Sequence, residues 1–135
     1  MIPKTILLLE DSPESLSVLR EVLNQAGFRV LEAGDSEEAV ELCKRHRRDL
    51  SLMISDVVLT GVTGPATAER IKLYCPDLPI LYISGHGRDE LLNRGLLDRE
   101  ETAWGSVRFL QKPFTTGELR NRVNAILNSS GSTSR

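Results

Sequence analysis

The sequence predicts an α/β fold built on one doubly wound, five-stranded parallel sheet. Short apolar runs alternate with amphipathic helical patterns along most of the chain, and such runs are typical of strands buried on both faces. The expected strands are 5–9, 28–33, 50–55, 79–83 and 107–111. Strand–helix units joined by right-handed crossovers form a three-layer sandwich, for which the strand order 2-1-3-4-5 is the simplest arrangement.

Start signals support the helical patterns that separate these strands. Pro13 suits the first turn of a helix, because its missing N–H would be unpaired there anyway. Asp35 and Glu38 form an acidic capping box before the second helix. Thr115 and Glu118 form the usual capping box before the last helix. The sequence therefore alternates strand and helix from end to end.

Two segments carry weaker patterns. A helix is expected around 91–97, and the stretch 98–106 after it is long enough to displace that helix. Trp104, in that stretch, could anchor a partner or cover the loop. The Ser- and Gly-rich tail 129–135 is expected to be disordered, which leaves one domain over 1–128.

Composition narrows the functional classes. The chain has 135 residues, 40% of them hydrophobic and 27% charged, with a net charge of −2 and both signs interspersed. No basic stripe suggests nucleic-acid binding, and no apolar run approaches the roughly 18 residues that span a bilayer. Lys4 is followed by only a short apolar run, unlike a signal peptide. A cytoplasmic domain is expected.

Cys43 is expected to be an ordinary core residue, and Cys75 a residue at the end of a helix. Cys43 and Cys75 provide neither a disulfide framework nor a metal-ligand spacing. Cys43 falls on the apolar face of its helix, and Cys75 precedes a proline at a helix end with no charged neighbour in sequence. A redox role is the less favoured interpretation of both.

Reactive side chains follow four of the expected strands. In chain order they are Glu10, Asp11, Asp56, Ser84 and Lys112. These four strands are neighbours in the expected order, and open α/β sheets bind ligands at the carboxyl ends of their strands. We therefore expect one shared site.

This set of side chains indicates phosphoryl chemistry with a divalent cation. Carboxylates about 4 Å apart repel by roughly 4 kcal/mol per pair at an effective dielectric near 20, so a cation is expected among them. Oxygen ligands with room for water and phosphate suit Mg²⁺. Lys112 and Ser84 could then hold an anion while Asp56 attacks phosphorus.

The chain resembles the receiver domain of two-component response regulators over nearly its whole length. Residues 7–11 resemble the family's first strand and acidic pair, and 54–64 its phosphoacceptor strand and loop. Residues 83–85 lie where the family keeps a Ser/Thr switch, and 109–114 match its Lys-Pro signature. The run 91–95 and the Lys-Pro string most resemble receivers attached to hybrid histidine kinases.

The resemblance implies a flavodoxin-like fold and assigns a role to each acid. Asp56 would be the phosphoacceptor. Asp11, Asp56 and the backbone carbonyl of Val58 would hold Mg²⁺, or Mn²⁺ in its place. Glu10 would order a water molecule bound to that ion.

The resemblance also implies a switch and a set of partners. Lys112 and Ser84 would grip the phosphoryl oxygens, and Phe109 would be the aromatic side chain that follows movement of Ser84. The fourth helix, fifth strand and fifth helix would form the surface that partners recognise, including a possible homodimer. The phosphodonor would be a histidine kinase or a histidine phosphotransfer protein, and the domain itself would be a signalling module rather than an enzyme.

The chain departs from the family pattern at several positions. Thr60 replaces a frequent proline, which predicts a looser loop after the phosphoacceptor. Val58 is apolar where some relatives carry a polar side chain, which leaves the phosphoryl lifetime open. Gly85 stands where alanine is common, and His86 is expected to be a solvated loop residue.

Three other functions depend on a similar fold or on similar residues. A phosphatase of the haloacid dehalogenase type needs a second aspartate two residues after Asp56, where this chain has Val58. A flavin carrier needs a phosphate-binding loop at 10–14, where this chain is acidic. A degenerate receiver would lack an acid or the lysine, and neither is missing.

Overall fold

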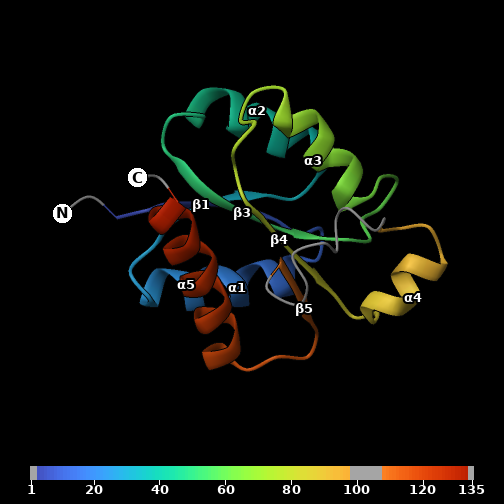
Figure 1. The fold of residues 1–135 in the computed structure, drawn as a ribbon. Helices are drawn as coiled ribbons and strands as arrows, with labels where there is room; N and C mark the ends of the chain where they lie inside the picture. Colours follow the sequence, from blue (N-terminus) through green and yellow to red (C-terminus); the bar gives the residue numbers. More distant parts are fainter. Residues whose placement is uncertain (1–2, 98–107, 134–135) are drawn as a thin grey trace.

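The expected parallel sheet is present, with the strand order β2-β1-β3-β4-β5 (Figure 1). The computed structural model describes residues 3–97 and 108–133. The strands are β1 (Thr5–Leu9), β2 (Arg29–Ala33), β3 (Leu50–Asp56), β4 (Ile80–Ser84) and β5 (Phe109–Gln111). The helices are α1 (Pro13–Gln25), α2 (Ser36–His46), α3 (Gly64–Lys72), α4 (Arg88–Asn93) and α5 (Thr116–Thr133). This is the flavodoxin-like, three-layer arrangement.

The sheet separates two hydrophobic cores, and β1 contributes to both. Leu7 and Leu9 belong to the core on the side of α2 and α3, whereas Ile6 and Leu8 belong to the core on the side of α1 and α5. This alternation is the two-residue period of a strand. All of β1 is buried, as expected of a strand covered by helices on both faces.

Side-chain caps begin the helices where the sequence predicts them. Asp35 accepts a hydrogen bond from the backbone N–H of Glu38 at 2.8 Å, and the Glu38 carboxylate accepts one from Gly34 at 2.9 Å. Thr115 and Glu118 form the predicted reciprocal capping box, at 2.9 and 3.0 Å. These caps fix where each helix leaves the carboxyl end of the preceding strand.

The chain differs from the sequence prediction at two helices. The α4 helix begins at Arg88 rather than near residue 91, and Gly95 follows it with φ of +73°. Asp89 and Glu90 in its first turn favour the earlier start through the helix dipole. The α5 helix continues to Thr133, into the tail 129–135 predicted to be disordered, because extending a formed helix costs little.

Some expectations fall on residues outside the described parts of the chain. These are residue 107 at the beginning of the predicted fifth strand, the long stretch 98–106 and the role of Trp104. Within the described residues, none of the helices has both the length and the apolar character needed to span a membrane.

Candidate functional site

The strand register brings the reactive residues to one edge of the sheet. Asp56 pairs with Ile83 on the neighbouring strand, and Ser84 pairs with Gln111 on the next one. The backbone N–H of Lys112 donates to the carbonyl of Ser84 at 2.8 Å. The ends of β3, β4 and β5 therefore lie level with one another, and β1 ends beside β3.

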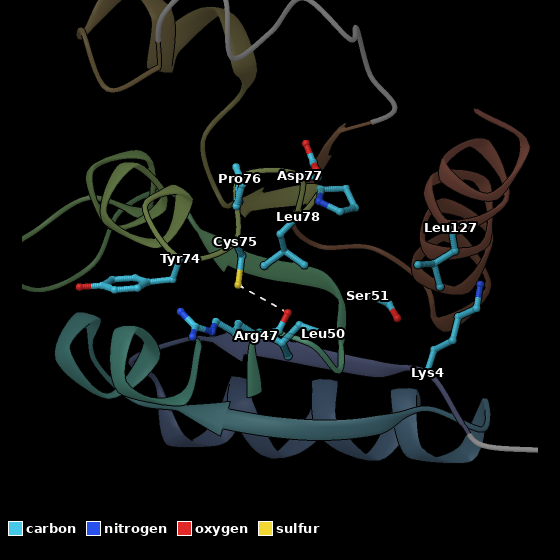
Figure 2. Close-up of a pocket in the computed structure, with 11 residues that line it drawn as sticks. Lys4, Arg47, Leu50, Ser51, Tyr74, Cys75, Pro76, Asp77, Leu78 and Leu127 are labelled. Carbon is cyan, nitrogen blue, oxygen red and sulfur yellow. Dashed lines mark hydrogen bonds between the residues drawn. The ribbon is translucent and has the colours of Figure 1, made fainter. Parts of the chain in front are cut away.

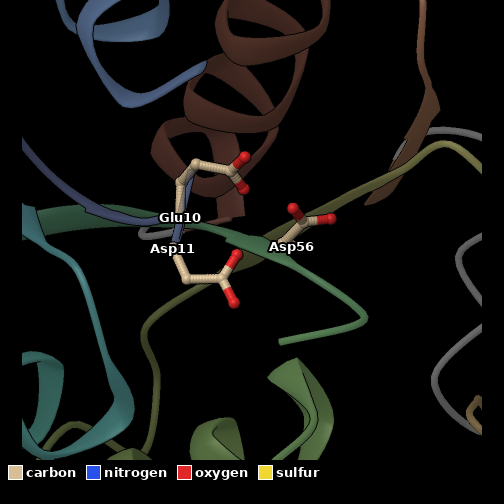
Figure 3. Close-up of side chains that lie close together, drawn as sticks. All are labelled: Glu10, Asp11 and Asp56. Atoms are coloured by element: carbon tan, nitrogen blue, oxygen red, sulfur yellow. The ribbon is translucent and has the colours of Figure 1, made fainter. Parts of the chain in front are cut away.

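Three carboxylates converge at this edge (Figure 3). Glu10, Asp11 and Asp56 each offer an oxygen, and these three oxygens lie within 4.8 Å of one another. Glu10 is only 1% exposed and Asp56 only 8%, so little water screens their repulsion. The structure thus assembles the acidic cluster that the sequence predicted.

Lys112 supplies the opposite charge. Its ammonium lies 3.1 Å from Asp56 Oδ2 and 3.3 Å from Glu10 Oε1. Burial lowers the pKa of Lys112, but the two carboxylates outweigh burial and hold this pKa above its usual value. Lys112 is therefore a fixed positive charge that contacts two of the three acids, Glu10 and Asp56.

The surroundings of Glu10 disfavour its ionised form. Burial, and next the adjacent Asp56 carboxylate, raise the pKa of Glu10 from 4.5 to about 8, although Lys112 opposes the shift. Its Oε2 atom is buried and has no hydrogen-bond partner within the described part of the chain. A buried oxygen without a partner, among carboxylates in excess of the available positive charge, fits a bound divalent cation.

Asp11 is held by a contact that the sequence did not reveal. Its Oδ2 atom accepts hydrogen bonds from the backbone N–H of Thr60 at 2.7 Å and from the Thr60 hydroxyl at 2.9 Å. A proline at position 60 would provide neither donor. Thr60 was predicted to loosen the loop after β3, but in the structure it ties that loop to Asp11.

Ser84 lies at the same edge with its hydroxyl engaged. The residue is 1% exposed, and its Oγ accepts a hydrogen bond from the backbone N–H of His86 at 3.0 Å. The His86 ring lies 3.2 Å from the Glu90 carboxylate, at the beginning of α4. A change at the Ser84 hydroxyl would therefore act directly on the segment that leads into α4.

The remaining predicted residues lie around this centre. Val58 forms an isolated backbone bridge with Thr63, and the residue is 40% exposed. Phe109 pairs with Tyr82 across the β4–β5 register, and its partly buried ring packs against the core on the α2–α3 side. The Lys112–Pro113 peptide bond is cis.

A close backbone approach fixes the end of β3, where Asp56 lies. The loop after β3 folds back so that Gly64 N–H donates to the Val57 carbonyl at 2.7 Å. A Cβ atom on Gly64 would lie 2.0 Å from the Asp56 carbonyl oxygen and 2.8 Å from Ser55 Oγ. Only glycine fits this position without displacing the backbone of Asp56.

Magnesium affinity should depend on pH through Glu10. Because the pKa of Glu10 is about 8 without metal, binding a cation beside it must release a proton below that pH. We expect Mg²⁺ affinity to rise by up to about tenfold per pH unit from roughly pH 6.5 to 8, and the rise to be much weaker in Glu10→Gln. Calorimetric titration in two buffers of different ionisation enthalpy would measure the proton release.

The same shift has a consequence for the metal-free protein. The folded-state pKa of Glu10 lies above its unfolded value of 4.5, so its contribution to stability is complete below about 4.5 and is lost as pH rises through about 8.

The predicted link between Mg²⁺ binding and the protonation of Glu10 has a clear contradicting outcome. A Mg²⁺ affinity that does not change with pH, in wild type as in Glu10→Gln, would contradict it.

Comparison with known proteins agrees with this geometry. Residues 6–124 match the family model of the response regulator receiver domain. The phosphate regulon transcriptional regulatory protein PhoB of Pseudomonas aeruginosa is 29% identical over 97% of this chain and 55% of its own length. The sensor kinase CckA of Brucella abortus is 28% identical over 91% of this chain and 12% of its own length.

A solved structure is also similar. The crystal structure of the receiver domain from the hybrid histidine kinase CckA covers 91% of this chain and 98% of its own, with 30% identity and a TM-score of 0.72. The site and fold define a receiver-type module. The chain belongs to the family of response regulator receiver domains. It spans about half the length of the regulator PhoB and a small part of the kinase CckA.

Proposed function

We propose that this domain receives a phosphoryl group on Asp56 from a phosphohistidine of a histidine kinase or a histidine phosphotransfer protein. The observation that carries the proposal is the contact between the Lys112 ammonium and Asp56 Oδ2 at 3.1 Å, inside the acidic cluster. Family membership supports it. The reaction would take place in the cytoplasm, where such donors act.

The chemistry follows from the groups around Asp56. A carboxylate oxygen of Asp56 attacks phosphorus, the phosphorus–nitrogen bond of the phosphohistidine breaks, and the imidazole leaves. Lys112 holds the incoming phosphoryl oxygens with a charge that is already in place. A phosphatase would also need an acid two residues further on, and Val58 cannot transfer a proton.

The acidic cluster would hold Mg²⁺, with Mn²⁺ as an alternative. Asp11, Asp56 and the backbone carbonyl of Val58 would be ligands, and Glu10 would order a bound water molecule. When bound, the ion neutralises charge on the transferring phosphoryl group. Thr60 keeps the Asp11 carboxylate oriented toward the cluster by its two hydrogen bonds.

Phosphorylation would alter the surface formed by α4, β5 and α5. The Ser84 hydroxyl, whose oxygen accepts from His86 N–H, would turn to donate its proton to a phosphoryl oxygen, and the Phe109 ring would then turn inward. This surface would be read by an output domain or by a second copy of the chain. The parent protein would be a response regulator or a hybrid histidine kinase, since relatives of both kinds match.

The phosphodonor would dock on an apolar cavity beside Lys112. This cavity of about 400 Å³ lies between α1 and the β5–α5 loop. Its lining residues are Glu14, Ser15, Val18, Leu19, Lys112, Pro113 and Phe114. Val18 is 63% exposed there, although it is a large hydrophobic residue. An apolar helix surface next to the phosphohistidine would cover it.

A charge in this cavity should slow transfer from a protein donor only. We expect Val18→Arg to reduce the transfer rate from a phosphorylated histidine phosphotransfer protein by at least about fivefold, because the interface would bury an unpaired charge. Phosphorylation by acetyl phosphate, which needs no docking surface, should be unchanged.

Leu73→Arg is the matched control. Leu73 is 79% exposed at the end of α3, on the other face of the sheet. Rates measured with radiolabelled donor should be normal for this variant. Equal rates for Val18→Arg and wild type would place the docking surface elsewhere.

The test of the proposed function is phosphotransfer profiling. Purified histidine kinases and phosphotransfer proteins of the same genome are phosphorylated and mixed with this chain and Mg²⁺, and the modified residue is mapped by mass spectrometry. Rapid, selective transfer from one donor to Asp56 is expected. Labelling of another residue, or no transfer from any donor or from acetyl phosphate, would reject the proposal.

A further inference from the structure

The two cysteines meet in the structure at the end of the sheet opposite the acidic cluster. Cys43 lies on α2 and Cys75 lies in the turn between α3 and β4. Although 32 positions separate them in sequence, their Sγ atoms are 2.9 Å apart. Both are free thiols in the structure. We propose that Cys43 and Cys75 form a dithiol site that small-molecule disulfides oxidise to an intramolecular disulfide.

Contacts on both sides of the pair hold the thiols in place. Arg70 on α3 donates to both carboxylate oxygens of Glu37 on α2, at 2.8 and 3.2 Å. Lys44 lies 5.2 Å from the centre of the Tyr74 ring. Within the turn, the N–H of Cys75 donates to the Ile71 carbonyl at 2.9 Å. Closing the disulfide would need little movement of either segment.

A cavity gives small molecules access to one thiol of the pair. It has a volume of about 430 Å³ and lies at the amino end of the sheet (Figure 2). Cys75 lines this cavity and is 7% exposed, whereas Cys43 is 0% exposed and is reached only through its contact with Cys75. Lys4 and Arg47 contribute positive charge to the lining, against one acid, Asp77. An anionic disulfide such as oxidised glutathione is suited to this entrance.

The order of the two steps follows from exposure. The Cys75 sulfur attacks one sulfur of the small disulfide, the disulfide bond breaks, and one thiol leaves with the proton of Cys75. Cys43 then attacks the Cys75 sulfur, and the second thiol leaves with the proton of Cys43. The protein loses two electrons and the small disulfide gains them.

The environment of Cys43 keeps it from reacting first. Burial, and next its contact with Cys75, raise the pKa of Cys43 to about 12, so it stays protonated and unreactive toward solvent oxidants. Once Cys75 is joined to the thiol that will leave, the Cys43 sulfur lies next to this mixed disulfide. Proximity then favours the intramolecular attack and offsets the small thiolate fraction of Cys43. The pair therefore closes instead of accumulating a mixed disulfide.

Oxidised glutathione is the probe for the test. The reduced, folded full chain is incubated with it, and products are identified by mass spectrometry with and without dithiothreitol. Wild type should form the Cys43–Cys75 disulfide and release two glutathione molecules per chain. Its thermal midpoint should rise by roughly 10 °C, because the cross-link restricts the unfolded chain, and dithiothreitol should reverse the rise.

Single variants separate the steps. Cys43→Ala should stop at a stable mixed disulfide on Cys75, and Cys75→Ala should not react while folded. Circular dichroism establishes that each variant is folded. A stable mixed disulfide on wild type, a disulfide between two chains, or unreactive thiols in the folded wild type would overturn the proposal. Because the phosphoacceptor is at the opposite end of the sheet, none of these outcomes depends on phosphorylation of Asp56.

Discussion

Asp56→Asn is expected to abolish phosphorylation of this chain by acetyl phosphate and by any phosphohistidine donor. The amide has the shape of the carboxylate but lacks the anionic oxygen that attacks phosphorus. It also removes one negative charge from the cluster that Lys112 faces, so the folded structure should persist or gain stability. Mass spectrometry of the intact chain and of its peptides, with Mg²⁺ present, measures the loss.

Asp49→Asn is the matched control for this experiment. Asp49 immediately precedes β3, whereas Asp56 ends the same strand, so the same chemical change is made at opposite ends of one element. Its carboxylate is exposed and lies 3.9 Å from His46. The acidic cluster is at the other end of β3, where Asp56 lies. Labelling should match wild type. Equal labelling of Asp56→Asn and Asp49→Asn would exclude Asp56 as the acceptor.

The fold could be predicted because local signals agree along the chain. The buried strands show as apolar runs, and the caps at Asp35 and Thr115 occur where the sequence placed them. Once five strand–helix units are recognised, handedness leaves few topologies. The strand ends then follow, which is why the acidic cluster and Lys112 were predicted to meet.

The details that were not predicted depend on long-range packing. The bonds from Thr60 to Asp11 join positions that are 49 apart in sequence, and no local pattern reports such a contact. The same holds for the contact between Cys43 and Cys75, because the sequence predicted one in the core and the other at a helix end, with no link between them. The α4 helix was misplaced because it has only six residues, too few to show a clear helical period.

The second large effect is expected at Gly64. Replacing it with alanine puts a carbon atom 2.0 Å from the Asp56 carbonyl oxygen, and the obstacle is backbone rather than a flexible side chain. We expect Gly64→Ala to lower the free energy of unfolding by about 3 kcal/mol, because the loop after β3 must move away from the strand. Urea unfolding measures this as a lower midpoint with an unchanged slope.

Gly85→Ala separates steric conflict from loss of glycine flexibility. Gly85 lies in the loop after β4, and a Cβ atom there would meet nothing within 4 Å. Its stability should stay within about 0.5 kcal/mol of wild type. Any Gly64→Ala protein that still folds should bind Mg²⁺ more weakly than Gly85→Ala, because displacing the Asp56 backbone moves its carboxylate relative to Glu10 and Asp11. Equal stability and equal Mg²⁺ affinity in the two variants would show that this close approach does not position the site.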